Sequence, residues 1–227
     1  MILLIDDADI QRIKEIYHYY LVDGVTTNPS ILAKYGENPY KALTAIREFI
    51  GIRAQLHVQV VSKTAEAMVE EGRKIERILG NNTYIKIPTV PEGLRAMQIL
   101  SGEGYHITAT AMYTPMQAYL AAKAGAEYAA PYVNRIDNLG NDGVFTTKKM
   151  QDIYVRNGLS TKILAAGFKN SQQVQELCEY GVSSVTVASD VIENFIKNAC
   201  VTSAVDDFVA DFEKLCGKGK TMLNCEE

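Results

Sequence analysis

Short apolar or β-branched segments alternate with longer segments of helical periodicity along the whole chain. Eight of the short segments have the length and composition of buried strands: Ile2–Asp6, Gly24–Asn28, Gln55–Val61, Thr83–Pro88, His106–Met112, Tyr128–Val133, Thr161–Gly167 and Ser183–Ser189. Each is followed by a stretch long enough for a helix. This alternation predicts an α/β protein whose parallel strands close into a (β/α)8 TIM barrel.

The helical pattern is clearest in Thr64–Leu79, where apolar residues recur at three- and four-residue intervals between Glu and Lys. We expect Thr64 to cap this helix and Ser171 to cap a later, more polar one. An open doubly wound sheet is the alternative fold. That fold usually carries a glycine-rich phosphate loop after its first strand, and the turn after Asp6 contains no glycine.

Length and composition agree with one folded domain. The 227 residues are 47% hydrophobic and 22% charged, and no low-complexity linker interrupts them. We therefore expect a single barrel domain over residues 1–227, with a C-terminal helix at 201–215 and a tail at 217–227.

Charge and composition also narrow the partners and the compartment. The net charge of −4 and the lack of a basic stripe argue against nucleic acid as a partner. The chain starts without a basic leader or a cleavage site, and it has no apolar run long enough to span a membrane. The four cysteines show no CxxC spacing. We expect a cytoplasmic protein with reduced thiols and no membrane association.

Metal and nucleotide chemistry lack their usual motifs. His18, His57 and His106 are the only histidines, and neither HxH nor HExxH occurs. No glycine-rich nucleotide loop is present. The sequence predicts an enzyme without a metal or another cofactor.

Strand periodicity indicates which side chains point into the barrel. In Thr83–Pro88, Ile85 and Ile87 should face the helices, and Lys86 should face inward with Tyr84. The same parity turns inward a set of polar residues near the carboxyl ends of their strands: Asp6, Thr26, Asn28, Gln59, Thr110 and Tyr132. Catalytic groups of barrel enzymes lie at that face, so these residues are the candidate site.

Lys86 is the candidate nucleophile. A lysine among Ile85, Ile87 and Pro88 should be poorly solvated, which lowers its pKa and releases an amine that can condense with a ketone. The alternative is a lysine whose stem packs in the barrel while its ammonium pairs with a carboxylate such as Asp6.

The other inward residues suit substrate binding and proton transfer. Asp6 can bind hydroxyls or move protons, and the Asn28 amide can donate to and accept from a polyol, with Thr26 beside it. Capping of a helix that begins near Pro29 is the alternative role of Asn28. Three further side chains should face the same part of the barrel interior and could hold a water for proton transfer: Gln59, Thr110 and Tyr132.

Two cations follow later strands. Arg135 lies in the loop after the sixth strand, and Lys169 lies beyond the seventh, where barrels commonly bind phosphate. Both suit an anionic end of the substrate, with Gly167 beside them. A surface salt bridge is the alternative role for each.

The chain resembles the small transaldolase family, and within it the fructose-6-phosphate aldolase branch. The segments that carry the resemblance are Gly24–Ser30, Tyr84–Pro88, Ala130–Asp137 and Phe168–Lys169. The resemblance implies that Lys86 forms the Schiff base, with Asp6 and Asn28 on the donor hydroxyls. It also implies a water held by the Gln59, Thr110 and Tyr132 trio, and Arg135 on the anionic end of the acceptor.

Three positions bear on the branch and on the acceptor. Transaldolases proper usually carry Glu at the position of Gln59 and often Phe at that of Tyr132, so this pair favours an aldolase that handles a free ketone. The resemblance implies cleavage of a ketose phosphate such as fructose 6-phosphate. Gly167 stands where the family typically has Ser, which leaves a phosphate, a sulfonate or a neutral acceptor open. The alternatives are a transaldolase using Lys86 and a non-catalytic barrel that binds sugar phosphates.

The resemblance also implies a homo-oligomer, because family members assemble into pentameric rings that often pair into decamers. The helix expected at 201–215 carries an apolar stripe at helical spacing: Val201, Val205, Phe208, Phe212 and Leu215. We expect this stripe to lie at a subunit contact. The alternative is that the helix closes its own barrel.

Overall fold

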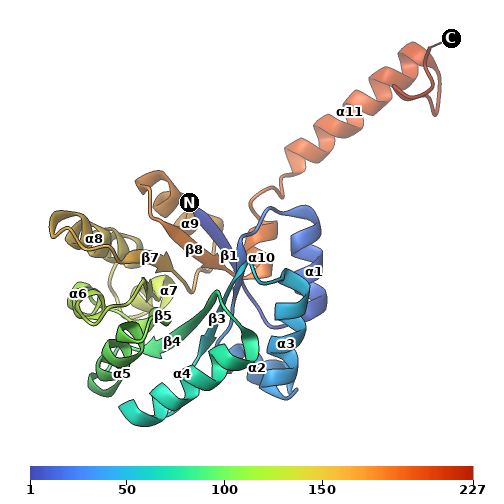
Figure 1. Cartoon of the computed structure of the whole chain (residues 1–227). Helices are drawn as coiled ribbons and strands as arrows, with labels where there is room; N and C mark the ends of the chain where they lie inside the picture. Colours follow the sequence, from blue (N-terminus) through green and yellow to red (C-terminus); the bar gives the residue numbers. More distant parts are fainter. Residues whose placement is uncertain (227) are drawn as a thin grey trace. The chain divides into compact units, whose positions relative to one another are not determined.

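A computed structural model describes residues 1–226 as two compact units, divided between Ile192 and Glu193. The first, the barrel unit, contains a closed barrel of parallel strands in the order β1 to β8 (Figure 1). The strands are β1 (Ile2–Asp6), β2 (Gly24–Thr26), β3 (Gln55–Gln59), β4 (Thr83–Pro88), β5 (His106–Met112), β6 (Tyr128–Pro131), β7 (Lys162–Ala165) and β8 (Ser184–Val187). The predicted (β/α)8 barrel is confirmed.

The predicted bounds hold for β1, β4 and β5, and the other strands are shorter than expected. β2 ends at Thr26 because Asn28 caps the next helix, and β6 ends at Pro131 because Tyr132 precedes another helix. β3, β7 and β8 likewise stop before the predicted ends. The sequence marked these residues as apolar or inward-facing, but the chain leaves the sheet there to form the loops at the carboxyl face.

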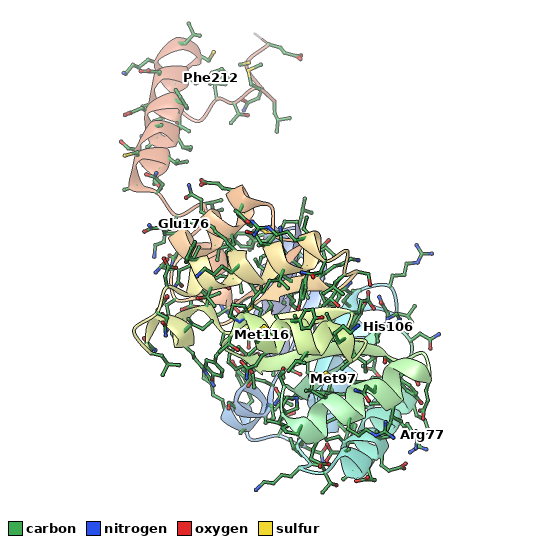
Figure 2. All side chains as sticks on the ribbon, turned by 90° about the vertical axis from the view of Figure 1, so that its left-hand side faces the viewer. Arg77, Met97, His106, Met116, Glu176 and Phe212 are labelled. Carbon is green, nitrogen blue, oxygen red and sulfur yellow. The ribbon has the colours of Figure 1, made fainter. Side chains whose placement is uncertain are left out.

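The helices of the barrel unit surround the strands (Figure 1). They are α1 (Ile10–Tyr19), α2 (Pro29–Tyr35), α3 (Pro39–Ile50), α4 (Ala65–Leu79), α5 (Pro91–Gly102), α6 (Pro115–Lys123), α7 (Val133–Asp137), α8 (Gly143–Arg156), α9 (Ser171–Tyr180) and α10 (Ser189–Glu193). Figure 2 shows this outer layer, with Met97 on α5 and Met116 on α6.

One predicted helix cap is confirmed and one is wrong. The Thr64 side chain accepts from the backbone N–H of Ala67 and caps α4. α9 is capped by Asn170, whose Oδ1 accepts from the N–H of Gln173 at 3.0 Å, and Ser171 is the first helical residue. Asparagine and serine both cap helices well, so local sequence did not fix the first helical turn.

The apolar core has two parts. The larger cluster fills the space between strands and helices, and it contains Ile85 and Ile87. The smaller cluster lies inside the barrel and consists of Leu4, Tyr84, Tyr128, Ala130 and Leu164, with Ile2 packed against it. Alternate residues of one strand therefore serve different cores, as strand parity requires.

A β-bulge interrupts the parity of β5. The register between β5 and β6 shifts between Ala109 and Met112, and Ala111 has a left-handed φ of 55°. The buried side chain of Met112 consequently joins the outer core, whereas Thr110 contacts Tyr132. Bulges near active sites re-aim side chains in this way, and the local pattern of residues does not reveal this one.

The second unit, the C-terminal unit, is built on α11 (Ala199–Cys216). The helix begins two residues before and ends one residue after the predicted span 201–215, because Asn198 caps it by accepting from the N–H of Cys200. None of its residues is buried, and Phe208 and Leu215 are 71% and 82% exposed. Phe212 is labelled on this helix in Figure 2.

Glu227, the end of the predicted tail, lies outside the described residues. Among residues 1–226, no helix combines the length and the apolar character needed to cross a membrane.

Candidate active site

Lys86 lies on the inner face of β4 and is only 4% exposed. Its Nζ donates a 2.8 Å hydrogen bond to the backbone carbonyl of Thr27, just beyond the end of β2. Tyr84 belongs to the inner core, and Ile85 and Ile87 belong to the outer one. The parity prediction for this strand is therefore confirmed.

Burial and a nearby carboxylate set the protonation of this amine. Burial lowers the pKa of Lys86 below its usual value, and the negative charge of Asp6 opposes this change. Burial raises the pKa of Asp6, against the opposing effects of Lys86 and Thr26. Both shifts favour the uncharged forms. The buried amine can thus lose its proton at a lower pH than an exposed lysine, which makes it available as a nucleophile.

The alternative prediction, an ion pair between Lys86 and Asp6, is not found among the described residues. Asp6 acts on Lys86 through its charge, but the direct partner of Nζ is the Thr27 carbonyl. A carbonyl oxygen can accept from an amine as well as from an ammonium, so this contact does not hold the group in its charged form.

Thr26 orients the Asp6 carboxylate by a hydrogen bond. The fully buried Thr26 hydroxyl donates to Asp6 Oδ1 at 2.7 Å and lies 2.7 Å from the hydroxyl of Thr186 on β8. Three neighbouring strands thereby fix the orientation of one carboxylate. The hydroxyl predicted to bind substrate is engaged with protein groups in this structure.

Asn28 caps α2, which was the alternative role considered for it. Its Oδ1 accepts a 3.0 Å hydrogen bond from the N–H of Ile31, and Pro29 occupies the first helical turn. Capping uses the amide oxygen only. The Asn28 amide nitrogen keeps two donors that can serve a ligand.

Two members of the predicted trio are in direct contact. The Thr110 hydroxyl and the Tyr132 phenol lie 2.9 Å apart. Gln59 forms no hydrogen bond with either of them in the described residues. Its Oε1 is buried and accepts no hydrogen bond from the described residues, so it has acceptor capacity for a water or a substrate hydroxyl. Gln59 also lines a hollow of about 420 Å³ beside α2, α3 and α4.

Arg135 lies over the Tyr132 ring. The guanidinium carbon is 4.7 Å from the ring centroid, and Nη1 donates to the Tyr113 hydroxyl at 3.4 Å. The rings of Tyr113 and Tyr132 pack edge to face. The arginine is exposed and held by aromatic groups, so its charge stays available next to the phenol.

Gly167 and Lys169 follow β7 and are both exposed. The backbone N–H of Lys169 donates to Gln173 Oε1 at 2.9 Å. Gly167 has a left-handed φ of 72°, and a Cβ there would meet nothing closer than the Tyr132 Cα at 3.8 Å. Backbone conformation, not lack of space, favours glycine at this position.

Sequence reasoning missed a cluster at the rim beside Asp6. Asp7 accepts from the Ser189 hydroxyl at 2.6 Å and from the Tyr35 hydroxyl at 3.1 Å, which ties β1, α2 and α10 together. A hollow of about 490 Å³ adjoins it, lined by Asp6 but not by Lys86. Asp7 follows Asp6 and points away by parity, so only its tertiary partners reveal its role.

Comparisons with known proteins show the family of this chain. Residues 3–223 match the family model described as Transaldolase/Fructose-6-phosphate aldolase. A "Probable fructose-6-phosphate aldolase" of Streptococcus pneumoniae is 39% identical over 213 residues, which cover 93% of this chain and 96% of that protein. A "Probable transaldolase" of Thermoplasma acidophilum is 37% identical, with 98% and 100% of the two chains covered.

A relative of lower identity and a solved structure extend these matches. A "Probable transaldolase" of Nitrosopumilus maritimus is 34% identical, with 95% and 96% of the two chains covered. A cube-shaped designed protein cage matches with a TM-score of 0.58 at 15% identity, over 83% of this chain and 63% of that one. At this identity the likeness to the cage concerns the fold alone.

Proposed function

The chain belongs to the transaldolase/fructose-6-phosphate aldolase family, and on this premise we propose that it is a class I aldolase acting through Lys86. Its reaction is reversible cleavage of a ketose phosphate such as fructose 6-phosphate to dihydroxyacetone and glyceraldehyde 3-phosphate. One observation carries the proposal: a buried amine, with its pKa lowered by burial, faces the barrel interior beside an engaged carboxylate.

The reaction begins when the neutral Lys86 amine attacks the C2 carbonyl of the ketose. The resulting carbinolamine loses its oxygen as water, which requires a proton, and leaves an iminium ion. Asp6, whose pKa is raised by burial, is suited to take up the proton that Lys86 loses and to deliver it to this oxygen. The positive iminium then draws electrons from the adjacent bond.

Cleavage of the C3–C4 bond follows. A base takes the proton of the C4 hydroxyl, the C4–O bond becomes a carbonyl, and the C3–C4 electrons form an enamine. Glyceraldehyde 3-phosphate leaves. A water held by Tyr132, Thr110 and Gln59 carries the proton, returns it to C3, and hydrolyses the iminium to dihydroxyacetone and free Lys86. The Thr110–Tyr132 hydrogen bond and the unused acceptor of Gln59 support this assignment.

The remaining candidates bind the substrate ends. Asp6 and the Asn28 amide nitrogen receive the donor hydroxyls, and Arg135 with Lys169 receives the phosphate. The stacked position of Arg135 over Tyr132 supports a single site in which the anionic end lies next to the proton relay.

A transaldolase is the second candidate, because relatives at 34% and 37% identity carry that name. The enamine on the same lysine would then add to an acceptor aldehyde, and the three-carbon unit would not be released by hydrolysis as free dihydroxyacetone. Gln59 and Tyr132, where transaldolases proper usually carry Glu and often Phe, favour the aldolase. A barrel that only binds sugar phosphates is the third reading, and it has no need for a buried amine.

Borohydride reduction in the presence of dihydroxyacetone tests the proposal. We expect a stable mass increase on the peptide that contains Lys86, and no increase would leave only the binding role. Release of free dihydroxyacetone from fructose 6-phosphate alone then distinguishes an aldolase from a transaldolase, which requires an added acceptor.

We also propose that the protein forms a homo-oligomer through α11. The apolar residues Val201, Val205, Phe208 and Leu215 are more than half exposed, which is a large apolar stripe for one helix. A Phe208→Glu variant should assemble less than the parent chain in sedimentation. Unchanged assembly would exclude the stripe as a contact.

A further inference from the structure

Two cysteines of the C-terminal unit lie against each other. Cys216 is the last residue of α11, and the thiol of Cys225 lies close enough to interact with its thiol. Both side chains are partly buried, whereas Cys178 and Cys200 are exposed. The sequence contains no CxxC motif, so this pair is formed by the fold of the C-terminus.

Hydrogen bonds turn the chain back after α11 and form what we call the C-terminal hook, residues 217–226. The N–H of Gly219 donates to Glu213 Oε1 at 2.9 Å, and the Lys220 ammonium donates to the Asn224 carbonyl at 2.8 Å. The N–H of Thr221 donates to Asn224 Oδ1 at 2.7 Å. These contacts return the chain to the end of the helix (Figure 1).

Glycine conformations permit the reversal. Gly217 and Gly219 have φ values of 104° and 74°, a region that residues with a Cβ rarely adopt. The approach of Cys225 to Cys216 is therefore built from backbone geometry and hydrogen bonds within the C-terminal unit.

We propose that Cys216 and Cys225 are a dithiol/disulfide site, which a small disulfide such as glutathione disulfide oxidises to an intramolecular bond that closes the hook. Neither cysteine belongs to the proposed catalytic site, so the disulfide proposal and the aldolase proposal can be tested and rejected independently.

The exchange balances in two steps. One cysteine loses its proton, and its thiolate attacks a sulfur of glutathione disulfide, which forms a mixed disulfide and expels one glutathione thiolate. The other cysteine loses its proton and attacks the protein sulfur of the mixed disulfide, which forms the Cys216–Cys225 bond and expels the second glutathione thiolate. Two electrons and two protons pass from the cysteines to the glutathiones.

Closing the hook has a local consequence. Leu215, the last residue of the apolar stripe, directly precedes Cys216. A disulfide would fix the backbone at this end of α11 and restrict the hook, because cross-linking removes conformations that the open chain can reach. Burial and the neighbouring thiol raise the pKa of Cys216, so the exchange should accelerate as the pH rises above neutrality.

The test uses the full chain, incubated with glutathione disulfide at mildly alkaline pH and then alkylated and weighed. We expect Cys216 and Cys225 to become inaccessible to alkylation, with loss of the mass of two hydrogens across this pair. Trypsin should cut after Lys214, Lys218 and Lys220, which leaves the peptide with Cys216 joined to the peptide beginning at Thr221. Reduction should separate the two peptides.

Matched variants make the result decisive. The Cys178→Ser/Cys200→Ser variant should lose the same two hydrogens at the same rate as the parent chain. Adding Cys225→Ser to this variant prevents closure of the hook, and a single glutathione adduct should accumulate on Cys216. Four alkylated thiols after incubation, separate glutathione adducts on both cysteines, or a disulfide-linked dimer as the main product would overturn the proposal.

Discussion

The Nζ of Lys86 rests 2.8 Å from the carbonyl oxygen of Thr27, across the barrel interior from β4 to the end of β2. No carboxylate of the described residues holds this amine in its ammonium form, and Asp6 influences it only through its charge. This contact uses one N–H of the amine, so the neutral form keeps its lone pair for attack on a carbonyl.

Replacing Lys86 by methionine should preserve the fold and remove catalysis. Methionine has a similar length and suits a buried position, so the unfolding transition should persist. Loss of a covalent nucleophile lowers kcat by roughly 10³-fold or more. Steady-state cleavage of fructose 6-phosphate measures this loss. The control is the Lys162→Met variant, because Lys162 is the first residue of β7 and lies at the end of the barrel away from the candidate site. This variant should retain Schiff-base trapping.

Replacing Tyr132 by phenylalanine should lower kcat with little change in KM. The substitution removes the hydroxyl that lies 2.9 Å from Thr110, and general acid–base groups contribute about 10²- to 10⁴-fold. Tyr113→Phe is the matched control, because it removes a phenol that contacts Arg135 but not Thr110. Equal losses in both variants would contradict a specific role for Tyr132.

Replacing Asp6 by asparagine should shift the pH profile toward acid. The rate rises with pH as Lys86 loses its proton, and the Asp6 charge raises the pKa of that lysine against the effect of burial. Without this charge the pKa of Lys86 falls further, so the rising limb moves to lower pH, whatever happens to the maximal rate. Asp9→Asn, at the start of α1, should leave the limb in place.

Replacing Arg135 by alanine should weaken binding of anionic acceptors selectively. A hydrogen bond to a charged group contributes about 1.5–3 kcal/mol, so KM for glyceraldehyde 3-phosphate in the synthetic direction should rise about 10- to 100-fold. KM for an uncharged aldehyde should change little. Parallel increases for both aldehydes would indicate damage to the site in place of lost anion recognition.

His57 should stay neutral in the folded protein. Burial, followed by the charges of Lys86, Arg47 and His106, lowers its pKa well below 6.5. The unfolded chain binds a proton below about pH 6.5 that the folded chain does not, so stability falls as the pH drops through that value. Urea unfolding should show a weaker acid dependence for His57→Phe, and nuclear magnetic resonance should show no titration of His57 near neutrality.

Periodicity within single strands determined which residues of this protein face the barrel interior. Alternation of side chains is a local property of extended backbone, so the inward position of Lys86 and the barrel itself could be read from the chain. The same reasoning brought Asp6, Thr110 and Tyr132 to one face, because parallel strands of a barrel all end on the same side.

Only the tertiary structure decided the contacts between strands distant in sequence. The acceptor of Lys86 is a carbonyl contributed by another strand, and Thr26 is engaged by Asp6 and Thr186. The bulge at Ala111, the exact strand ends and the choice of Asn170 over Ser171 as a cap depend on register and packing. These are set by long-range pairing of backbone and side chains, which the local pattern of polar and apolar residues does not encode.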